Sequence, residues 1–180
     1  MITLTPCGEA KQQIDAIRED FSLRYHVQEA LKNEAHITLI HPFHTTIQIA
    51  DKLIDKLTKV YVYLNPIDIT INRYGFFKQN RVVFLKPERN MYLKDLYDIT
   101  YEFINSRFPD IKLRTVKAYT AHITIGYRDL NKYDFTQAEA ELKDKNENIY
   151  WTQDSVKVWK RVENNWETIA EIKLGEGGRK

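Results

Sequence analysis

The tetrapeptide Ala-His-Ile-Thr occurs twice, as Ala35-His36-Ile37-Thr38 and as Ala121-His122-Ile123-Thr124. Each copy is followed by an aliphatic residue, and the two histidines lie 86 positions apart in a chain of 180 residues. Both copies belong to β-branched, apolar runs that are typical of strands, in which side chains alternate between the two faces. The histidine and threonine of each copy therefore share one face, and the isoleucine points the other way, into a core.

The repetition changes how this short motif is interpreted. One His-x-Thr on a strand is more often a half-buried histidine with ordinary hydrogen bonds, because short motifs match by chance. Two copies with the same apolar pattern, one in each half of the chain, favour a shared role. Two such strands side by side would present two imidazoles and two hydroxyls to one small anion.

Composition limits the possible protein classes. A length of 180 residues suits one domain, or two lobes around a shared cleft. The content of 43% hydrophobic and 12% aromatic residues is typical of folded globular proteins. A net charge of +2 is too small to indicate a nucleic-acid-binding protein by itself. Local clusters of basic residues can still bind phosphates.

The lack of a recognisable targeting signal and the single cysteine both favour a cytoplasmic location. The N-terminal residues lack a basic region followed by a long apolar one, and no later stretch approaches 18 uninterrupted apolar residues. The single cysteine, Cys7, has no partner within the chain for a disulfide, which fits a reducing compartment. We therefore expect a cytoplasmic protein without a membrane partner.

Apolar spacing predicts the order of helices and strands. Helical spacing is found around 10–21, 49–60 and 91–107, and strands are expected at 2–4, 67–74 and 81–85 besides the two histidine strands. The pattern Thr136-Gln137-Ala138-Glu139 matches a capping box that begins a short helix. Two final strands follow, the second with 166, 168, 170, 172 and 174 on one parity, joined by a turn at 163–165. This mixture indicates an α+β fold in one domain over 1–180, with a flexible tail at 175–180.

At these motifs the sequence resembles the two-histidine (2H) phosphoesterase superfamily, which contains LigT-type 2',3'-cyclic phosphodiesterases, also named 2'-5' RNA ligases. Two pairs of residues, Pro42-Phe43 and Arg128-Asp129, suggest the small bacterial YjcG-like branch. The stretches that carry the resemblance are His36-Ile37-Thr38-Leu39, Gly75-Phe76-Phe77, Arg81-Val82-Val83-Phe84 and His122-Ile123-Thr124-Ile125 with Arg128-Asp129-Leu130.

The resemblance implies a bilobal fold with pseudo-twofold symmetry, in which two antiparallel sheets with helices outside form a central cleft. It implies His36 and His122 as catalytic residues and Thr38 and Thr124 as phosphate binders. We expect no cofactor and no metal ion. Many members of the family carry a basic residue five positions after the second histidine, where this chain has Tyr127 followed by a basic residue. If the strand continues, alternation would place Arg128 on the face of His122, Thr124 and Gly126.

Two histidines can perform the reaction that this family implies. Opening a cyclic phosphodiester needs a base to deprotonate water and an acid to protonate the departing ribose oxygen. An ordinary pKa of about 6.5 lets one imidazole be neutral while the other is protonated. Threonine hydroxyls can donate hydrogen bonds to the non-bridging oxygens, so no metal is required.

Residues that bind the substrate outside the reacting phosphate are harder to identify. Arg81 and Arg128 are candidates to pair with phosphates, and Tyr127 and Phe77 are candidates to stack on a base. For each aromatic residue, packing in the core is the more common role. The expected partners are RNA ends or small cyclic nucleotides as substrates, with no obligate protein partner.

Three alternatives stay open at this stage. His36, His41 and His44 suggest a transition-metal site, but they lack the context that such motifs normally have. An RNA-binding module without turnover would keep the basic and aromatic residues but would not need two matched histidines. Joining of RNA ends would use the same residues, so the sequence does not separate hydrolysis from ligation.

Overall fold

The computed structural model describes residues 1–116 and 118–175 of the chain. In these ranges, antiparallel strands and helices are mixed, which confirms the expected α+β class. The expected tail at 175–180 lies outside the described residues, except for Gly175. The elements in order are β1 (Ile2–Leu4), α1 (Gly8–Tyr25), the 3₁₀-helix η1 (Glu29–Lys32), β2 (Ile37–Ile40), α2 (Ile47–Tyr61), β3 (Ile67–Phe77), β4 (Val82–Pro87), α3 (Met91–Arg107), β5 (Ile123–Gly126), α4 (Lys132–Leu142), β6 (Asn146–Gln153), β7 (Ser155–Val162) and β8 (Asn165–Lys173).

The strands form one sheet whose neighbours are all antiparallel. Their order is β6-β3-β4-β5-β2-β1-β7-β8. At the middle of the sheet, β2 and β5 meet at one pair of Cα partners, Ile37 and Ile123. Four strands lie on either side of this junction, so the two sheets that we expected are two halves of one sheet, joined at the histidine strands.

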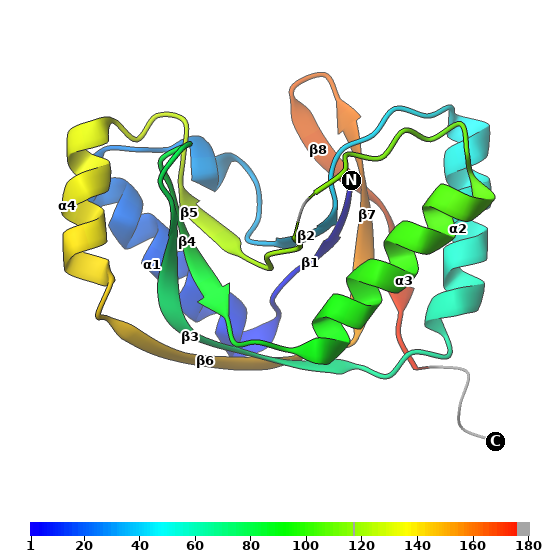
Figure 1. Cartoon of the computed structure of the whole chain (residues 1–180), viewed down its shortest axis with the longest axis horizontal. Coiled ribbons are helices and arrows are strands. Elements are labelled where there is room, and N and C mark those ends of the chain that lie inside the picture. Colours follow the sequence, from blue (N-terminus) through cyan, green and yellow to red (C-terminus); the bar gives the residue numbers. More distant parts are fainter. Residues whose placement is uncertain (117, 176–180) are drawn as a thin grey trace.

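Each half of the sheet carries its own helices (Figure 1). Helices α1 and α4 lie with the half that contains β3 to β6, and α2 and α3 lie with the half that contains β1, β2, β7 and β8. The two halves rise on either side of β2 and β5, which gives the chain the outline of a U. Strands from early and late parts of the sequence share one half, so the lobes are interleaved along the chain.

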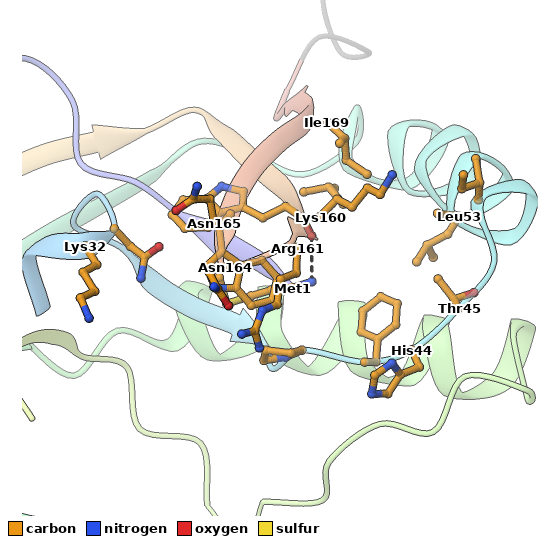
Figure 2. A pocket seen from close by; sticks show the side chains of 18 of the residues that line it. Met1, Lys32, His44, Thr45, Leu53, Lys160, Arg161, Asn164, Asn165 and Ile169 are labelled. Carbon is orange, nitrogen blue, oxygen red and sulfur yellow. Dashed lines mark hydrogen bonds between the residues drawn. The ribbon is translucent and has the colours of Figure 1, made fainter. Parts of the chain in front are cut away.

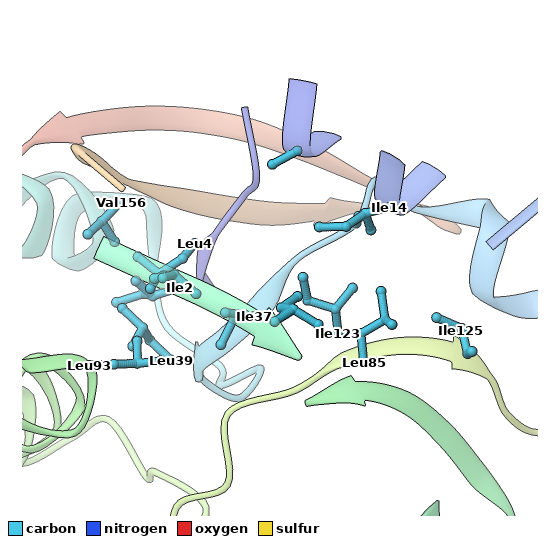
Figure 3. Close-up of a cluster of buried hydrophobic side chains, with 14 of the residues drawn as sticks. Ile2, Leu4, Ile14, Ile37, Leu39, Leu85, Leu93, Ile123, Ile125 and Val156 are labelled. Carbon is cyan, nitrogen blue, oxygen red and sulfur yellow. The ribbon is translucent and has the colours of Figure 1, made fainter. Parts of the chain in front are cut away.

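The junction between the halves is part of the hydrophobic core. Ile37 and Ile123 are both 0% exposed, and Leu39 and Ile125 are also buried. Figure 3 shows these side chains grouped with apolar residues from both halves. Burial of each such side chain contributes about 1.5–3 kcal/mol, so this face fixes which way the two strands turn their other side chains.

Three helices begin at side chains that bind free backbone N–H groups. Thr46 accepts a hydrogen bond from the N–H of Ile49 at the start of α2. Asn90 and Asn131 accept corresponding bonds at the starts of α3 and α4. Such caps are worth about 1 kcal/mol each. Within the described part of the chain, no helix has the length and apolar character needed to cross a membrane.

The predictions were wrong at strand β6 and at the start of helix α4. Strand β6 was not expected, because its inward positions include the polar Gln153 and it follows a charged, polar segment. Its place comes from pairing with β3, where Ile149 faces Ile71. Helix α4 begins at Lys132 and not at the capping box, because Asn131 already caps it, and Thr136 donates to a carbonyl inside the helix.

The prediction that one parity holds along the whole last strand is wrong, because a β-bulge interrupts β8. Thr168 is the partner of Trp159, whereas Ala170 is the partner of Val158, so one extra residue separates them on β8. A bulge of this kind turns the following side chains to the opposite face. Trp166 and Thr168 therefore share the face of Trp159, while Ala170 and Ile172 share the face of Val158.

Candidate active site

The two histidines stand just before the two central strands. His36 precedes β2, His122 precedes β5, and both side chains are half-buried. The next residues, Ile37 and Ile123, are fully buried. Strand alternation therefore turns each histidine and its threonine to the face opposite the isoleucine core, as the repeated motif predicts.

The antiparallel register places the histidine of each motif opposite the threonine of the other motif. Because Ile37 is the partner of Ile123, one step along each strand brings His36 level with Thr124, and Thr38 level with His122. Thr38 and Thr124 are both partly exposed. The arrangement has pseudo-twofold symmetry about the isoleucine pair, and each histidine gains the threonine of the other motif as its neighbour.

Both imidazoles are oriented by the same kind of hydrogen bond. The Nδ1 atom of His36 lies 2.8 Å from the carbonyl oxygen of Glu34. The Nδ1 atom of His122 lies 2.8 Å from the carbonyl oxygen of Thr120. A carbonyl oxygen only accepts, so Nδ1 carries the hydrogen in both rings. Each ring therefore keeps Nε2 as the nitrogen that can take up or release a proton.

Burial lowers the pKa of both histidines. For His122, desolvation lowers the pKa below 6.5, and the hydrogen bond to Thr120 works in the opposite direction. For His36, desolvation again has the largest effect, and the positive charges of Arg18 and His122 lower the pKa further. The influence of His122 on His36 indicates that the protonation of one ring affects the other.

His36 is enclosed by β7. Its ring lies 4.9 Å from the ring of Trp159, measured between centroids, and Trp159 is 5% exposed. Lys157, two residues earlier on the same face of β7, donates to the carboxylate of Glu34 at 2.9 Å. This ion pair holds the residue whose carbonyl orients His36. Neither Lys157 nor Trp159 was a sequence candidate, because only strand pairing brings β7 beside β2 through β1.

His122 is enclosed by two phenylalanines. The rings of Phe77 and Phe84 each lie 5.2 Å from the imidazole in edge-to-face contacts. Phe84 is the Cα partner of Gly75, and a Cβ atom at Gly75 would lie 2.2 Å from the Phe84 ring. The glycine therefore leaves the space that the Phe84 ring occupies beside the histidine.

A buried arginine fixes the segment before His36. Arg18 is 4% exposed, and its guanidinium donates to the carbonyls of Ala30 and Asn33, the latter at 2.7 Å. It also pairs with Asp15 at 3.2 Å. These contacts tie α1 to η1 and to Asn33, the residue that follows it. Helical spacing in the sequence did not distinguish Arg18 from a solvent-exposed arginine.

The predicted substrate-binding residues occupy different settings. Phe77 lies against His122, as described above. The Nε atom of Arg81 donates to the carbonyl of Leu130 at 3.0 Å, which links the β3–β4 turn to the segment after β5. Tyr127 and Arg128 are in contact, with the guanidinium 5.2 Å from the centre of the Tyr127 ring. Their roles toward a substrate stay predictions.

Strand β5 does not continue to Arg128, so the condition for placing Arg128 on the face of His122 is not met. The strand ends at Gly126, and Arg128 has a left-handed backbone with φ of 56°. A register shift places Gly126 opposite Val83 but Thr124 opposite Phe84, so Thr124 and Gly126 face opposite sides. Arg128 instead lies 4.0 Å from Glu29, and Asp129 accepts hydrogen bonds from backbone N–H groups at the start of η1.

The histidines near Pro42 do not form a metal-binding group. Across residues 1–116 and 118–175, no cluster of three or more His, Cys, Asp or Glu side chains is suited to hold a metal ion. His41 is partly buried, and desolvation and the charges of Arg114 and His122 lower its pKa. His41 is thus close enough to His122 and Arg114 for their positive charges to disfavour its protonated form.

A cavity of about 1150 Å³ lies among the β7–β8 hairpin, η1 and α2 (Figure 2), and neither His36 nor His122 is among its lining residues. Trp159, which contacts His36, is one of its lining residues. One wall comes from the β7–β8 hairpin, and another contains η1 with Tyr127 and Arg128. The cavity continues toward α2, where Figure 2 shows Thr45 and Leu53.

Comparisons with known proteins agree over nearly the whole chain. Residues 6–165 match the family model of the 2'-5' RNA ligase superfamily. The crystal structure of E. coli LigT complexed with phosphate is similar, with a TM-score of 0.70 and 14% sequence identity over 96% of this chain and 95% of that chain. The protein TT0787 of Thermus thermophilus has a TM-score of 0.64 and 12% identity, over 99% and 98%. No curated protein matches the sequence. At these identities the solved structures establish a common fold.

Proposed function

The chain belongs to the 2'-5' RNA ligase superfamily, and we propose that it opens 2',3'-cyclic or related phosphates of RNA ends or nucleotides by metal-independent, two-histidine acid–base catalysis. The observation that carries this proposal is the matched setting of the two imidazoles. Each donates Nδ1–H to a backbone carbonyl two residues earlier, which leaves Nε2 for proton transfer.

The proposed reaction needs one neutral and one protonated imidazole. The neutral histidine takes a proton from water as the water oxygen bonds to phosphorus. The protonated histidine gives its proton to the ribose oxygen as the bond between that oxygen and phosphorus breaks. The product is a phosphomonoester beside a free ribose hydroxyl. The base has gained a proton from water and the acid has lost one to the ribose oxygen, so the two histidines end with their protonation states interchanged.

The threonines act on the other phosphate oxygens in this proposal. Thr38 and Thr124 lie on the same strand faces as the histidines and are partly exposed. Their hydroxyls can donate hydrogen bonds to the non-bridging oxygens, where negative charge concentrates in the transition state. A symmetric pair of donors suits a phosphate held between two symmetric imidazoles.

The finer likeness to the YjcG-like branch rests on two pairs of residues. Pro42 and Phe43 line the same cavity as Arg128, and Asp129 binds the start of η1. Pro42, Phe43 and Arg128 thus line one cavity, and the proposed placement in this branch rests on the two sequence pairs.

Ligation is the second candidate. The same imidazoles can activate the 5'-hydroxyl of a second RNA strand in place of water, and the family's name refers to that activity. Water at about 55 M favours hydrolysis unless a second strand is positioned by the protein.

A substrate screen tests the proposal. We would incubate the protein with 2',3'-cyclic nucleotides, oligonucleotides that end in a cyclic phosphate, and ADP-ribose 1",2"-cyclic phosphate, with and without a 5'-hydroxyl strand. Ring opening to a phosphomonoester supports hydrolysis, and a longer strand supports ligation. Binding of these compounds without any turnover would replace the proposal with the RNA-binding module.

A further inference from the structure

Strand β1 brings a third threonine, Thr3, to the face of the sheet that carries the two histidines. Strand β1 lies between β2 and β7, and Thr3 is the Cα partner of Thr38 on β2 and of Lys157 on β7. Its neighbours in the sequence, Ile2 and Leu4, are fully buried and belong to the apolar cluster of Figure 3. Strand alternation therefore turns the Thr3 side chain to the opposite face, which is the face of Thr38 and the histidines.

Four polar side chains form one row across this face. Because Thr38 is level with His122, the row consists of one residue from each of β7, β1, β2 and β5, in the order Lys157, Thr3, Thr38 and His122. Directly opposed residues of antiparallel strands have Cβ atoms about 4.5–5.5 Å apart, and opposed threonines can form hydrogen bonds. Thr3 is thus the direct neighbour of the proposed phosphate binder Thr38.

Within the described part of the chain, the Thr3 hydroxyl has no hydrogen-bond partner. Thr3 is 0% exposed, and its Oγ1 atom is buried without a donor or acceptor from residues 1–116 and 118–175. An unpaired buried hydroxyl costs free energy, so such groups are rare and call for an explanation. Thr38 beside it is partly exposed, and its hydroxyl can rotate to become the missing partner.

The other threonine of the site has a different neighbour. Thr124 is the Cα partner of Phe84 on β4, whose ring has no hydroxyl to offer. The pseudo-twofold symmetry that relates Thr38 to Thr124 therefore ends one strand further out. A hydroxyl lies beside Thr38 and an aromatic ring beside Thr124, so the two phosphate binders are not equivalent.

We infer that Thr3 is a positioning residue, whose hydroxyl donates a hydrogen bond to Oγ1 of Thr38 while the Thr38 hydrogen points at the reacting phosphate. A hydroxyl has one donor and two acceptor lone pairs, so Thr38 can accept from Thr3 and donate to a non-bridging oxygen at the same time. The bond that Thr38 accepts strengthens the bond that it donates. This inference rests on the proposed function and adds to it a residue outside the two histidine motifs.

Threonine-to-valine variants test this role, because valine keeps the β-branched shape and removes the hydroxyl. Thr3→Val should lower kcat on a nucleoside 2',3'-cyclic phosphate about five- to ten-fold, with a smaller change in KM, since one ordinary hydrogen bond is lost. Thr3→Ser keeps the hydroxyl and should retain most of kcat. In the Thr38→Val background Thr3→Val should add little, whereas in the Thr124→Val background the same loss should persist.

Thr100 provides the matched control for stability. It is also 0% exposed, but its hydroxyl donates to the carbonyl of Leu96 at 2.6 Å and lies 2.7 Å from the hydroxyl of Tyr61. Thr100→Val should lower the midpoint of denaturant unfolding and leave kcat unchanged. Thr3→Val should keep or raise the midpoint, because it removes an unpaired hydroxyl, while it lowers kcat.

Three results would contradict this role of Thr3. Unchanged kcat in Thr3→Val, or equal effects in the Thr38→Val and Thr124→Val backgrounds, would overturn the inference and leave the proposed function in place. A fall of the unfolding midpoint as large as that of Thr100→Val would also overturn it, since the Thr3 hydroxyl would then be paired within the protein itself. Failure of the wild-type protein to open the cyclic phosphate would instead remove the proposed function, and this role of Thr3 with it.

Discussion

Ile37 and Ile123 are the Cα partners at which the two halves of the sheet meet, and this pairing sets the two histidine motifs crosswise. Because the pair is antiparallel, His36 is level with Thr124, and Thr38 is level with His122. The catalytic proposal follows from this geometry: each end of the site has one imidazole and one hydroxyl, contributed by different strands.

The first prediction concerns the hydroxyls. Thr38→Val and Thr124→Val keep the shape of a β-branched side chain but remove one donor to the phosphate. Each should lower kcat by about 10² with a smaller change in KM, because the lost bond is strongest in the transition state. Steady-state kinetics on a cyclic-phosphate substrate measures this. Unchanged kcat in both variants would show that the hydroxyls do not bind the reacting phosphate.

The second prediction uses the close approach of Gly75 and Phe84. Gly75→Ala should push the Phe84 ring away from His122 and lower turnover about ten-fold or more, since small displacements of a catalytic group are costly. The accompanying overpacking should reduce the free energy of unfolding by about 1–3 kcal/mol, measured by denaturant titration.

Gly126→Ala is the matched control for this change. Its Cβ would lie 2.4 Å from the Phe21 ring of α1, so it creates a similar clash on the face away from His122. We expect a similar loss of stability with a smaller loss of turnover. Equal losses of turnover in the two variants would mean that Phe84 has no specific effect on His122.

The third prediction is the pH profile. Burial lowers the pKa of both histidines below 6.5, so in the free protein each proton is lost at a lower pH than in an exposed histidine. The singly protonated pair is the active form, and kcat/KM should therefore be bell-shaped with its maximum below about pH 6.5. The limbs belong to the coupled pair, because each ring affects the other.

Substrate binding should move this profile toward higher pH. The negative charge of the phosphate favours the protonated imidazoles and raises both apparent pKa values, so kcat should peak at a higher pH than kcat/KM. A rate that climbs steadily from pH 6 to 10 would show that no protonated histidine acts as the acid.

The fourth prediction is independence from metal ions. Two imidazoles supply both the base and the acid, so turnover should persist after exhaustive chelation with EDTA. Turnover is measured before and after chelation, and again after addition of single divalent ions. Loss of activity that one divalent ion restores would favour a metallohydrolase reaction instead.

Much of the site could be predicted from the sequence because it depends on local patterns. Alternation around Ile37 and Ile123 predicted the faces of the histidines, and periodic apolar residues predicted α3 at its observed bounds. The family resemblance added the cleft and the symmetry. Strand alternation and helical periodicity depend on residues that are close together in the chain, which is why the sequence predicts them.

The surroundings of the histidines depend on long-range pairing and could not be predicted. Trp159 and Lys157 reach His36 only because β1 joins β2 to β7. The bulges in β5 and β8 reverse side-chain parity without a glycine or proline signal at the inserted residue, Ile125 or Ile169. Arg18 is buried and donates to backbone carbonyls only when η1 folds against α1.

The most direct test of the two-histidine account is the turnover of a 2',3'-cyclic phosphate by His36→Ala, His122→Ala and the double variant. Each single change should lower kcat by about 10²–10⁴ in a folded protein, because it removes the acid or the base. The double variant should lose far less than the product of the two, since the residues act as a unit. Near-normal turnover by either folded single variant would contradict the account.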